Sequence, residues 1–237
     1  MTSLDSRQSN SSQSLDRSQL LQLVETLQEQ AKRKRENRLI DYQPYAKQRE
    51  FHKELQREAL LMAGNQLGKT YCGAADTAFH LTGLYPDWWE GRRWERPVRW
   101  WAASKTGEVT RDGVQRYLVG EPKDESQWGT GMVPKDCLLS SKRRMGVADA
   151  LDSITVRHVS GGISTLGFKS YDQGRQKWQG ETLDGVWFDE EPPMDIYMEG
   201  LTRTNATKGL TRITFTPLLG MSEVVSMFLN EEALEAA

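Results

Sequence analysis

The chain has 237 residues, enough for one substantial α/β domain, and its formal net charge of -2 excludes a chain-wide basic surface for nucleic acid. Its two cysteines, Cys72 and Cys137, give neither a disulfide framework nor a zinc-binding pattern, which favours a reducing, cytoplasmic setting. The sequence contains no run of about 18 apolar residues, the length that would predict a membrane span. Its first residues lack the pattern of a signal peptide.

The first 40 residues are polar and differ in composition from the rest. Residues 1–17 are rich in Ser, Gln and Asp, which is typical of disordered segments. In residues 18–40, the spacing of leucine and valine predicts a helix over 18–37 that Ser18 can cap. The end of this helix, residues 32–38, is strongly basic. It is either a solvated terminus, where cations are favoured, or a docking element for nucleic acid or a partner.

Residues 41–230 are predicted to form one domain, with a short tail at 231–237. A helix is expected after Pro44, and an apolar run predicts the first strand at 58–63. The sequence then reads Ala-Gly-Asn-Gln-Leu-Gly-Lys-Thr from residue 63 to residue 70, and a helix is expected to follow from 69 to 81. A strand, a glycine loop, Lys-Thr and a helix in this order are typical of a phosphate-binding P-loop.

The P-loop pattern gives its residues definite roles. The glycines permit a turn that points backbone N–H groups at phosphate oxygens, and the following helix N-terminus adds its own preference for anions. Lys69 can reach the β- and γ-phosphates, and the Thr70 hydroxyl can hold Mg²⁺. The first position of the pattern departs from it, because Ala63 replaces a glycine. The predicted nucleotide-contacting residues are Ala63, Gly64, Asn65, Gln66, Leu67, Gly68, Lys69 and Thr70.

An irregular segment at 84–97 mixes tryptophans with arginines. Such a segment either touches DNA phosphates and bases or fastens a loop onto the domain, and we favour packing. The elements expected after it are a strand at 98–103, a helix at 107–119, a long loop at 120–146 and a hairpin of two strands, 153–159 and 163–170, joined by Gly161-Gly162.

The second half of the predicted site ends a strand at 183–189. Residues 186–191 read Val-Trp-Phe-Asp-Glu-Glu, an apolar strand followed by acids, which is the Walker B form. Asp189 is predicted to support Mg²⁺, and Glu190 to orient and deprotonate the attacking water. Glu191 is expected to point to the other side of the strand and is the weaker candidate. A helix of about ten residues follows Pro192-Pro193, and a strand is expected at 212–215.

Strands that alternate with helices predict an α/β fold with a mainly parallel central sheet flanked by helices on both faces. Over residues 40–230 the chain resembles the ATPase domain of the tailed-bacteriophage terminase large subunit. The matching features are the helix with Gln48, the P-loop, the Walker B strand and the run Thr214-Phe215-Thr216-Pro217. The resemblance implies a P-loop NTPase of the additional-strand, catalytic-glutamate (ASCE) type.

The resemblance also implies roles and partners. Gln48 would read the adenine edge, since an amide donates and accepts at once. Thr214 and Thr216 would belong to the coupling motif that senses the γ-phosphate. The implied activity is Mg²⁺-dependent hydrolysis of ATP that drives double-stranded DNA into procapsids in the host cytoplasm. The implied partners are DNA, the portal of the procapsid, the small terminase subunit and further copies of the chain in a ring, with no membrane.

The chain departs from the family pattern in two further respects. Members place an arginine inside the P-loop or just before a glycine upstream of Walker B, where this chain has Asn65 and Gln179. The charge-neutralising arginine finger is therefore expected elsewhere, with Arg175 as the first candidate and Arg203 as the weaker one, unless each forms only a surface salt bridge. Only about 20 residues follow Pro217, so we expect no nuclease domain in this chain.

Two other functions remain open at this point. The chain could be a helicase-like DNA-dependent ATPase, although Asp-Glu-Glu-Pro is not the usual helicase acid motif. It could also be a nucleotide-binding module that switches without turnover, although the intact Glu190 argues against this.

Overall fold

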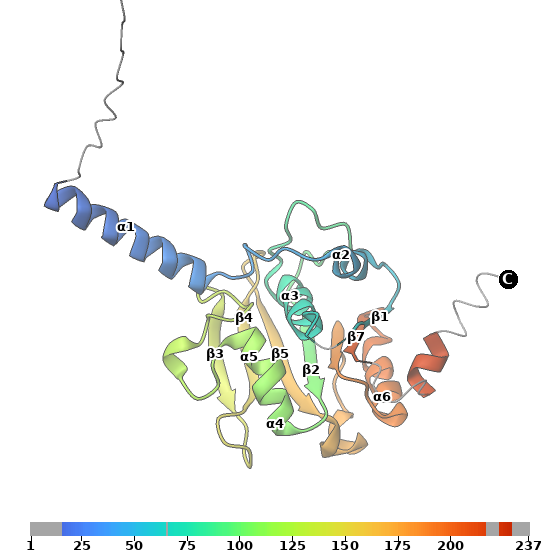
Figure 1. Ribbon diagram of the computed structural model, residues 1–237. Coiled ribbons are helices and arrows are strands. Elements are labelled where there is room, and N and C mark those ends of the chain that lie inside the picture. Colours follow the sequence, from blue (N-terminus) through green and yellow to red (C-terminus); the bar gives the residue numbers. More distant parts are fainter. Residues whose placement is uncertain (1–15, 65, 217–222, 229–237) are drawn as a thin grey trace, which may run out of the picture. The chain divides into compact units, whose positions relative to one another are not determined.

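The computed structural model describes residues 16–64, 66–216 and 223–228, and divides the chain into two units, Met1–Arg35 and Glu36–Ala237 (Figure 1). Helix α1 (Arg17–Glu36) agrees to within one residue at each end with the helix expected at 18–37, and all of its apolar side chains are exposed. The predicted tail at 231–237 and almost all of the segment 1–17 lie outside the described residues. No helix in the described part is both long and apolar enough to span a membrane.

The second unit is built on a seven-stranded sheet with the strand order β1-β7-β6-β2-β5-β4-β3. Neighbouring strands from β1 to β5 in this order are parallel, whereas β4 and β3 are antiparallel to their neighbours. The prediction of a mainly parallel α/β sheet is therefore confirmed. The strands are β1 (Glu58–Met62), β2 (Arg99–Ser104), β3 (Leu138–Arg143), β4 (Leu151–Arg157), β5 (Ile163–Ser170), β6 (Gly185–Asp189) and β7 (Leu210–Phe215).

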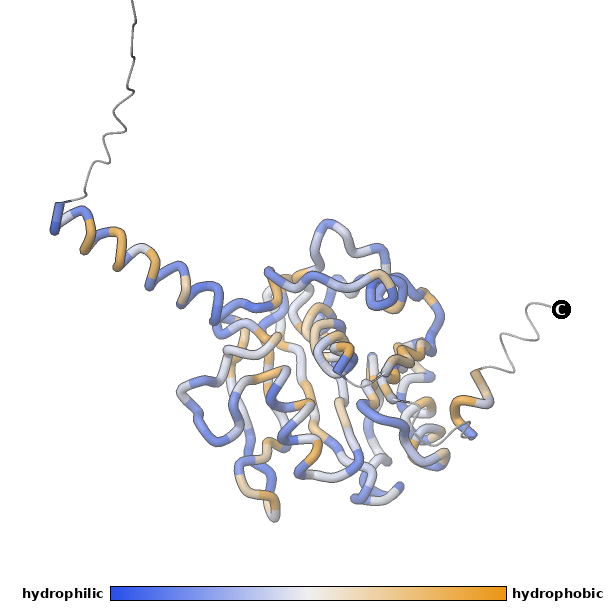
Figure 2. Tube along the Cα trace, viewed as in Figure 1, coloured by the Kyte–Doolittle hydropathy of each residue, from blue (hydrophilic) through white to orange (hydrophobic). Residues whose placement is uncertain are grey.

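Helices cover both faces of this sheet. Because successive side chains along a strand point to opposite faces, the strands contribute residues to a hydrophobic core on each face. On β2, Trp100 packs into the core shared with α3, and Trp101 packs into the opposite core with α6. Figure 2 shows apolar residues along α3 and along the strands. The helical elements are α2 (Ala46–Lys53), α3 (Lys69–Thr82), α4 (Gly107–Val109), the π-helix η1 (Thr110–Gln115), α5 (Arg116–Val119), η2 (Glu125–Gln127), η3 (Tyr171–Gln173), η4 (Arg175–Trp178) and α6 (Met194–Thr204).

Two expectations need correction. The long loop expected at 120–146 contains the edge strand β3, whose side chains are almost all exposed. An exposed edge strand lacks the alternation of apolar and polar residues that reveals a half-buried strand. The single helix expected at 107–119 is divided by the π-helix η1. A π-helix changes the hydrogen-bond spacing without changing composition, so the sequence pattern does not show it.

Helix α3 packs closely against the sheet because its buried face is made of small residues. Ala74, Ala75 and Ala78 are fully buried, and Gly83 ends the helix with a φ of 73°, as expected. Gly73 lies in the helix interior, where glycine costs about 1 kcal/mol relative to alanine. A Cβ at this position would lie 2.3 Å from Cε2 of Trp187, so the close approach of α3 to β6 requires glycine here.

The buried carboxylate of Asp76, on α3, connects this helix to α2 and β7. Asp76 Oδ1 accepts a hydrogen bond from His52 Nδ1 at 2.8 Å, and Asp76 Oδ2 lies 3.6 Å from His80 Nε2 and 3.7 Å from Arg212 Nε. Burial alone would raise the pKa of Asp76, but the His52 hydrogen bond and the electrostatic interactions with His80 and Arg212 hold this pKa below its ordinary value. The ionised carboxylate therefore fixes β7 against the helix that follows the P-loop.

The segment at 84–97 packs onto the domain, which was the favoured interpretation. Trp89 and Trp94 are buried in the core shared with α3. The Arg92 guanidinium lies 4.0 Å from the ring centroid of Trp94, a cation–π contact that keeps the arginine at the surface and the indole beneath it.

Candidate nucleotide-binding site

Thr70, Asp189 and Thr214, three of the predicted site residues, meet where β1, β7 and β6 end. Carboxyl ends of parallel strands share one edge of a sheet, and ligands bind there in open α/β folds. Strand β7 lies between the P-loop strand β1 and the Walker B strand β6, and Thr214 is in register with both Leu61 and Asp189. This interposed strand places Thr214 between the two halves of the site.

Two residues of the predicted P-loop have left-handed backbone conformations. Gln66 and Gly68 have positive φ values of 60° and 72°, and Asn65 lies outside the described residues. The Lys69 side chain is buried and donates from Nζ to the Gly64 carbonyl at 2.6 Å. A Cβ on Gly68 would lie 3.3 Å from Gln48 Nε2, so the Gln48 side chain packs closely against the loop. Binding of phosphate groups by this loop stays a prediction, and these contacts show how the loop is held.

Three oxygen-bearing side chains converge at the predicted metal position. Thr70 Oγ1 donates to Asp189 Oδ1 at 3.0 Å, and Thr214 Oγ1 donates to the same oxygen at 2.9 Å. Burial raises the pKa of Asp189 to about 7, and the two hydroxyl donors act against this shift. A hydroxyl and a carboxylate side by side suit Mg²⁺, which takes few protein ligands and keeps phosphate and water oxygens.

Glu190 has a left-handed backbone conformation with a φ of 65°, which is rare for residues other than glycine. Its N–H donates to the Thr214 carbonyl at 2.7 Å, and its own carbonyl accepts from the Tyr171 hydroxyl at 2.7 Å. Tyr171 Oη also donates to the Asp189 carbonyl at 3.0 Å, and burial raises its pKa, so it remains a donor. Strained residues held this firmly from both sides occur mainly at functional sites.

Gln48 contacts the P-loop from beneath. Its Nε2 donates to the carbonyls of Leu67 and Gly68, each at 3.3 Å, and its Oε1 accepts from the Tyr45 N–H at 3.0 Å. Its polar groups are thus already bonded within the protein. The predicted contact with adenine stays a prediction and requires these bonds to be exchanged.

The two candidate arginine fingers bind the same carboxylate. Arg175 Nε donates to Glu199 Oε2 at 2.8 Å, and an Arg203 guanidinium nitrogen donates to Glu199 Oε1 at 3.1 Å. The Arg175 side chain is 62% exposed, and Arg203 is on α6 one turn after Glu199. This is the salt-bridge arrangement that the sequence left open. A finger role for either arginine stays a prediction, because it requires Glu199 to be exchanged for phosphate.

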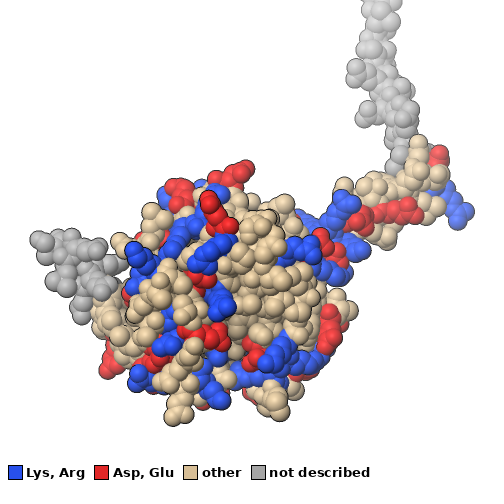
Figure 3. All heavy atoms as spheres, turned by 180° about the vertical axis from the view of Figure 1, so that it is seen from behind, with Lys and Arg blue, Asp and Glu red and all other residues tan. Residues whose placement is uncertain are grey.

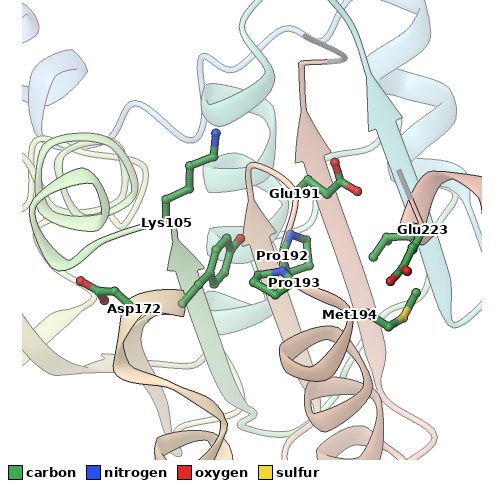
Figure 4. Close-up of a pocket in the computed structure, with 9 residues that line it drawn as sticks. Lys105, Asp172, Glu191, Pro192, Pro193, Met194 and Glu223 are labelled. Carbon is green, nitrogen blue, oxygen red and sulfur yellow. The ribbon is translucent and has the colours of Figure 1, made fainter. Parts of the chain in front are cut away.

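A cavity of about 600 Å³ lies beside the Walker B acids (Figure 4). Glu191, Tyr171 and the start of α6 line it, together with Lys105, an exposed cation directly after β2. Sequence reasoning missed Lys105 and Tyr171. Both come directly after a strand of the parallel sheet, and this position was the available signal that they would lie at the edge with the site.

The π-helix η1 also lies beside the site. A Cβ built on Gly113, within η1, would be 3.9 Å from Asp189 Oδ2. Short π-helical segments occur frequently at functional sites. Gly113 of η1 therefore lies close to Asp189, which the sequence did not indicate.

A phosphate-binding loop, a Walker B strand and an interposed strand that joins them define a P-loop NTPase fold. The chain belongs to the terminase large subunit family, as the resemblance implied. The family model described as terminase large subunit, T4likevirus-type, N-terminal, matches residues 60–236.

The relatives of the chain agree with this assignment. It is 42% identical over 231 residues to the terminase large subunit of Salmonella phage P22, covering 89% of this chain and 46% of that protein. It is 24% identical over 226 residues to the terminase large subunit of Enterobacteria phage LP7, covering 89% of this chain and 47% of that protein. The chain thus spans about half the length of these curated relatives.

The fold is similar to that of the large terminase ATPase domain of Thermus phage P74-26. The TM-score is 0.54 at 17% sequence identity, and the match covers 81% of this chain and 72% of that one. At this identity the likeness concerns the fold, and it agrees with the α/β architecture expected from the sequence.

Proposed function

We propose that this chain hydrolyses ATP in a Mg²⁺-dependent reaction that drives double-stranded DNA into viral procapsids. The observation that carries the proposal is the contact of Thr70 and Thr214 with Asp189, which unites the P-loop, the Walker B strand and the strand between them. Glu190 follows Asp189 directly and is fixed by backbone hydrogen bonds on both sides.

Each residue of the site has a task in this reaction. The loop amides and Lys69 bind the phosphates, and Thr70 and Asp189 would hold Mg²⁺, which would supply positive charge to stabilise the phosphates during the reaction. Glu190 orients the attacking water and accepts its proton. Thr214 contacts Asp189, and through this contact the coupling strand β7 responds to what the site binds.

The proposed partners are duplex DNA, the procapsid portal, the small terminase subunit and further copies of this chain in a ring, within the host cytoplasm. Membership of the terminase large subunit family supports them. On the face shown in Figure 3, lysine and arginine are interspersed with acids. This mixture agrees with the net charge and does not by itself mark a path for DNA.

Release of inorganic phosphate from ATP by the purified chain tests the proposal. We expect Mg²⁺-dependent release that rises when duplex DNA and procapsids are present together. Stimulation by DNA alone, with strand separation, would support a helicase-like ATPase instead. Nucleotide binding without phosphate release would support a switch module.

Asp189→Asn is expected to weaken Mg²⁺ binding and raise the Mg²⁺ concentration required for hydrolysis. Asparagine keeps the size of the side chain and can still accept hydrogen bonds from Thr70 and Thr214, but it lacks the charge that a dication prefers. A titration of ATPase activity with Mg²⁺ measures the change. An unchanged Mg²⁺ requirement would exclude Asp189 as a ligand.

An arginine finger from a neighbouring subunit is the proposed source of the missing cation. In assembled protein, Arg175→Ala is expected to slow hydrolysis, and mixing it with Glu190→Gln protein is expected to restore activity. The Glu190→Gln subunit keeps Arg175 and so completes a neighbour's intact site. The same experiment applies to Arg203→Ala, and Arg116→Ala, at an exposed salt bridge with Glu121, is the control. If neither candidate variant slows the assembled enzyme, the finger lies elsewhere.

A further inference from the structure

Trp187 begins a chain of hydrogen bonds that ends at the predicted magnesium ligand. Its indole is fully buried in β6, two residues before Asp189, so both side chains are on one face of the sheet. The indole Nε1–H donates to Thr214 Oγ1 at 2.9 Å, and this hydroxyl donates to Asp189 Oδ1 at 2.9 Å. An indole N–H can only donate, so the single proton of the hydroxyl is left for the carboxylate.

Gly73 on α3 provides the space that the indole fills. A Cβ there would lie 2.3 Å from Cε2 and 2.4 Å from Nε1 of Trp187. Gly73 is one helical turn after Thr70, whose hydroxyl also donates to Asp189. The indole therefore contacts both elements that supply hydroxyl groups to the site, α3 through Gly73 and β7 through Thr214.

We propose that Trp187 is a positioning residue for the ATP site. Its N–H fixes the rotation of the Thr214 hydroxyl, and that hydroxyl holds the Asp189 carboxylate facing Thr70. The inference rests on the proposed function, because it concerns how Asp189 and Thr70 bind Mg²⁺. In Trp187→Phe, the Thr214 hydroxyl is free to turn away and Asp189 loses a donor that orients it. The consequence is weaker Mg²⁺ binding with unchanged binding of nucleotide alone.

Trp100 offers a matched control for this substitution. It is buried in β2 and packs against a glycine in the same way, since a Cβ on Gly185 would lie 2.2 Å from its ring. Its Nε1 has no hydrogen-bond partner among the described residues. Trp100→Phe therefore replaces an indole with a phenyl ring, as Trp187→Phe does, and removes an N–H group without breaking a hydrogen bond.

The test measures ADP binding by calorimetry over a range of Mg²⁺ concentrations, so that no turnover is needed, together with the Mg²⁺ dependence of hydrolysis and the Tm. Trp187→Phe is expected to raise the Mg²⁺ concentration for half-maximal binding by about 3- to 10-fold, the range for one lost hydrogen bond. Trp100→Phe is expected to leave it unchanged. Equal shifts in both variants, or a lower Tm in Trp187→Phe with the Mg²⁺ dependence of the wild type, overturn the proposal.

A second comparison begins with two Thr214 variants, which can be measured whether or not Trp187→Phe folds. Thr214→Val removes the hydroxyl, whereas Thr214→Ser keeps it and is expected to recover most of the Mg²⁺ affinity that Thr214→Val loses. Adding Trp187→Phe to Thr214→Val is expected to cause no further shift, because no hydroxyl remains to be fixed. Equal losses in the two Thr214 variants, or additive losses in the double variant, contradict the proposal. A wild-type chain whose nucleotide binding ignores Mg²⁺ would contradict the proposed function instead.

Discussion

We expect Lys69→Ala to abolish ATP hydrolysis while the protein stays folded. The ammonium group supplies positive charge at the β- and γ-phosphates, where negative charge accumulates during the reaction. Loss of one such fixed stabilising group typically slows an enzyme by roughly 10²- to 10³-fold, and weaker ATP binding adds to this. Lys69 begins α3, and its Nζ bonds only to the Gly64 carbonyl among the described residues. Alanine is the best helix former, so the helix should persist.

Phosphate release and the Tm, measured on the same preparations, test this expectation. Lys123→Ala is the matched control, because Lys123 is an exposed lysine in the loop after α5. Normal hydrolysis by Lys69→Ala would show that the P-loop assignment is wrong. Loss of hydrolysis together with unfolding would show that Lys69 is needed for the fold. The Tm distinguishes this result from loss of hydrolysis in a folded protein.

Glu190→Gln should bind ATP as the wild type does and lose turnover by about 10²-fold or more, the usual scale for a removed general base. The amide has nearly the shape of the carboxylate but cannot accept a proton from water. The backbone bonds to Thr214 and Tyr171 involve main-chain groups of Glu190, so the substitution leaves them in place. The positive φ is equally unfavourable for either side chain, so stability should change little.

Glu191→Gln is the control for this experiment. Glu191 is the next acid in the chain and lines the cavity beside the site. Single-turnover measurements with both variants, alongside equilibrium binding of ATP, compare the two acids directly. A greater loss in Glu191→Gln than in Glu190→Gln would reverse our assignment of the base.

The sequence predicted those parts of the molecule where residue type is tied to backbone geometry. Glycines at the P-loop, the apolar strands and the acids after β6 are such cases. Strand β3 was missed because its side chains are exposed, and η1 was missed because a π-helix leaves no compositional trace. Tertiary contacts account for the rest. The hydrogen bonds of Gln48 to the P-loop carbonyls join residues about 20 apart in the chain, and the sequence holds no record of which partner the amide finds.

At position 190, the residue that best suits the backbone conformation differs from the residue that the proposed chemistry requires. A left-handed conformation costs a residue with a side chain about 1–3 kcal/mol, and glycine would avoid most of this cost. Glycine carries no carboxylate, however, so the substitution that suits the backbone would remove the proposed base. A laboratory selection for heat resistance alone would therefore favour changes at residue 190 and enrich inactive proteins. Thermostable variants of this domain should be sought with position 190 held constant.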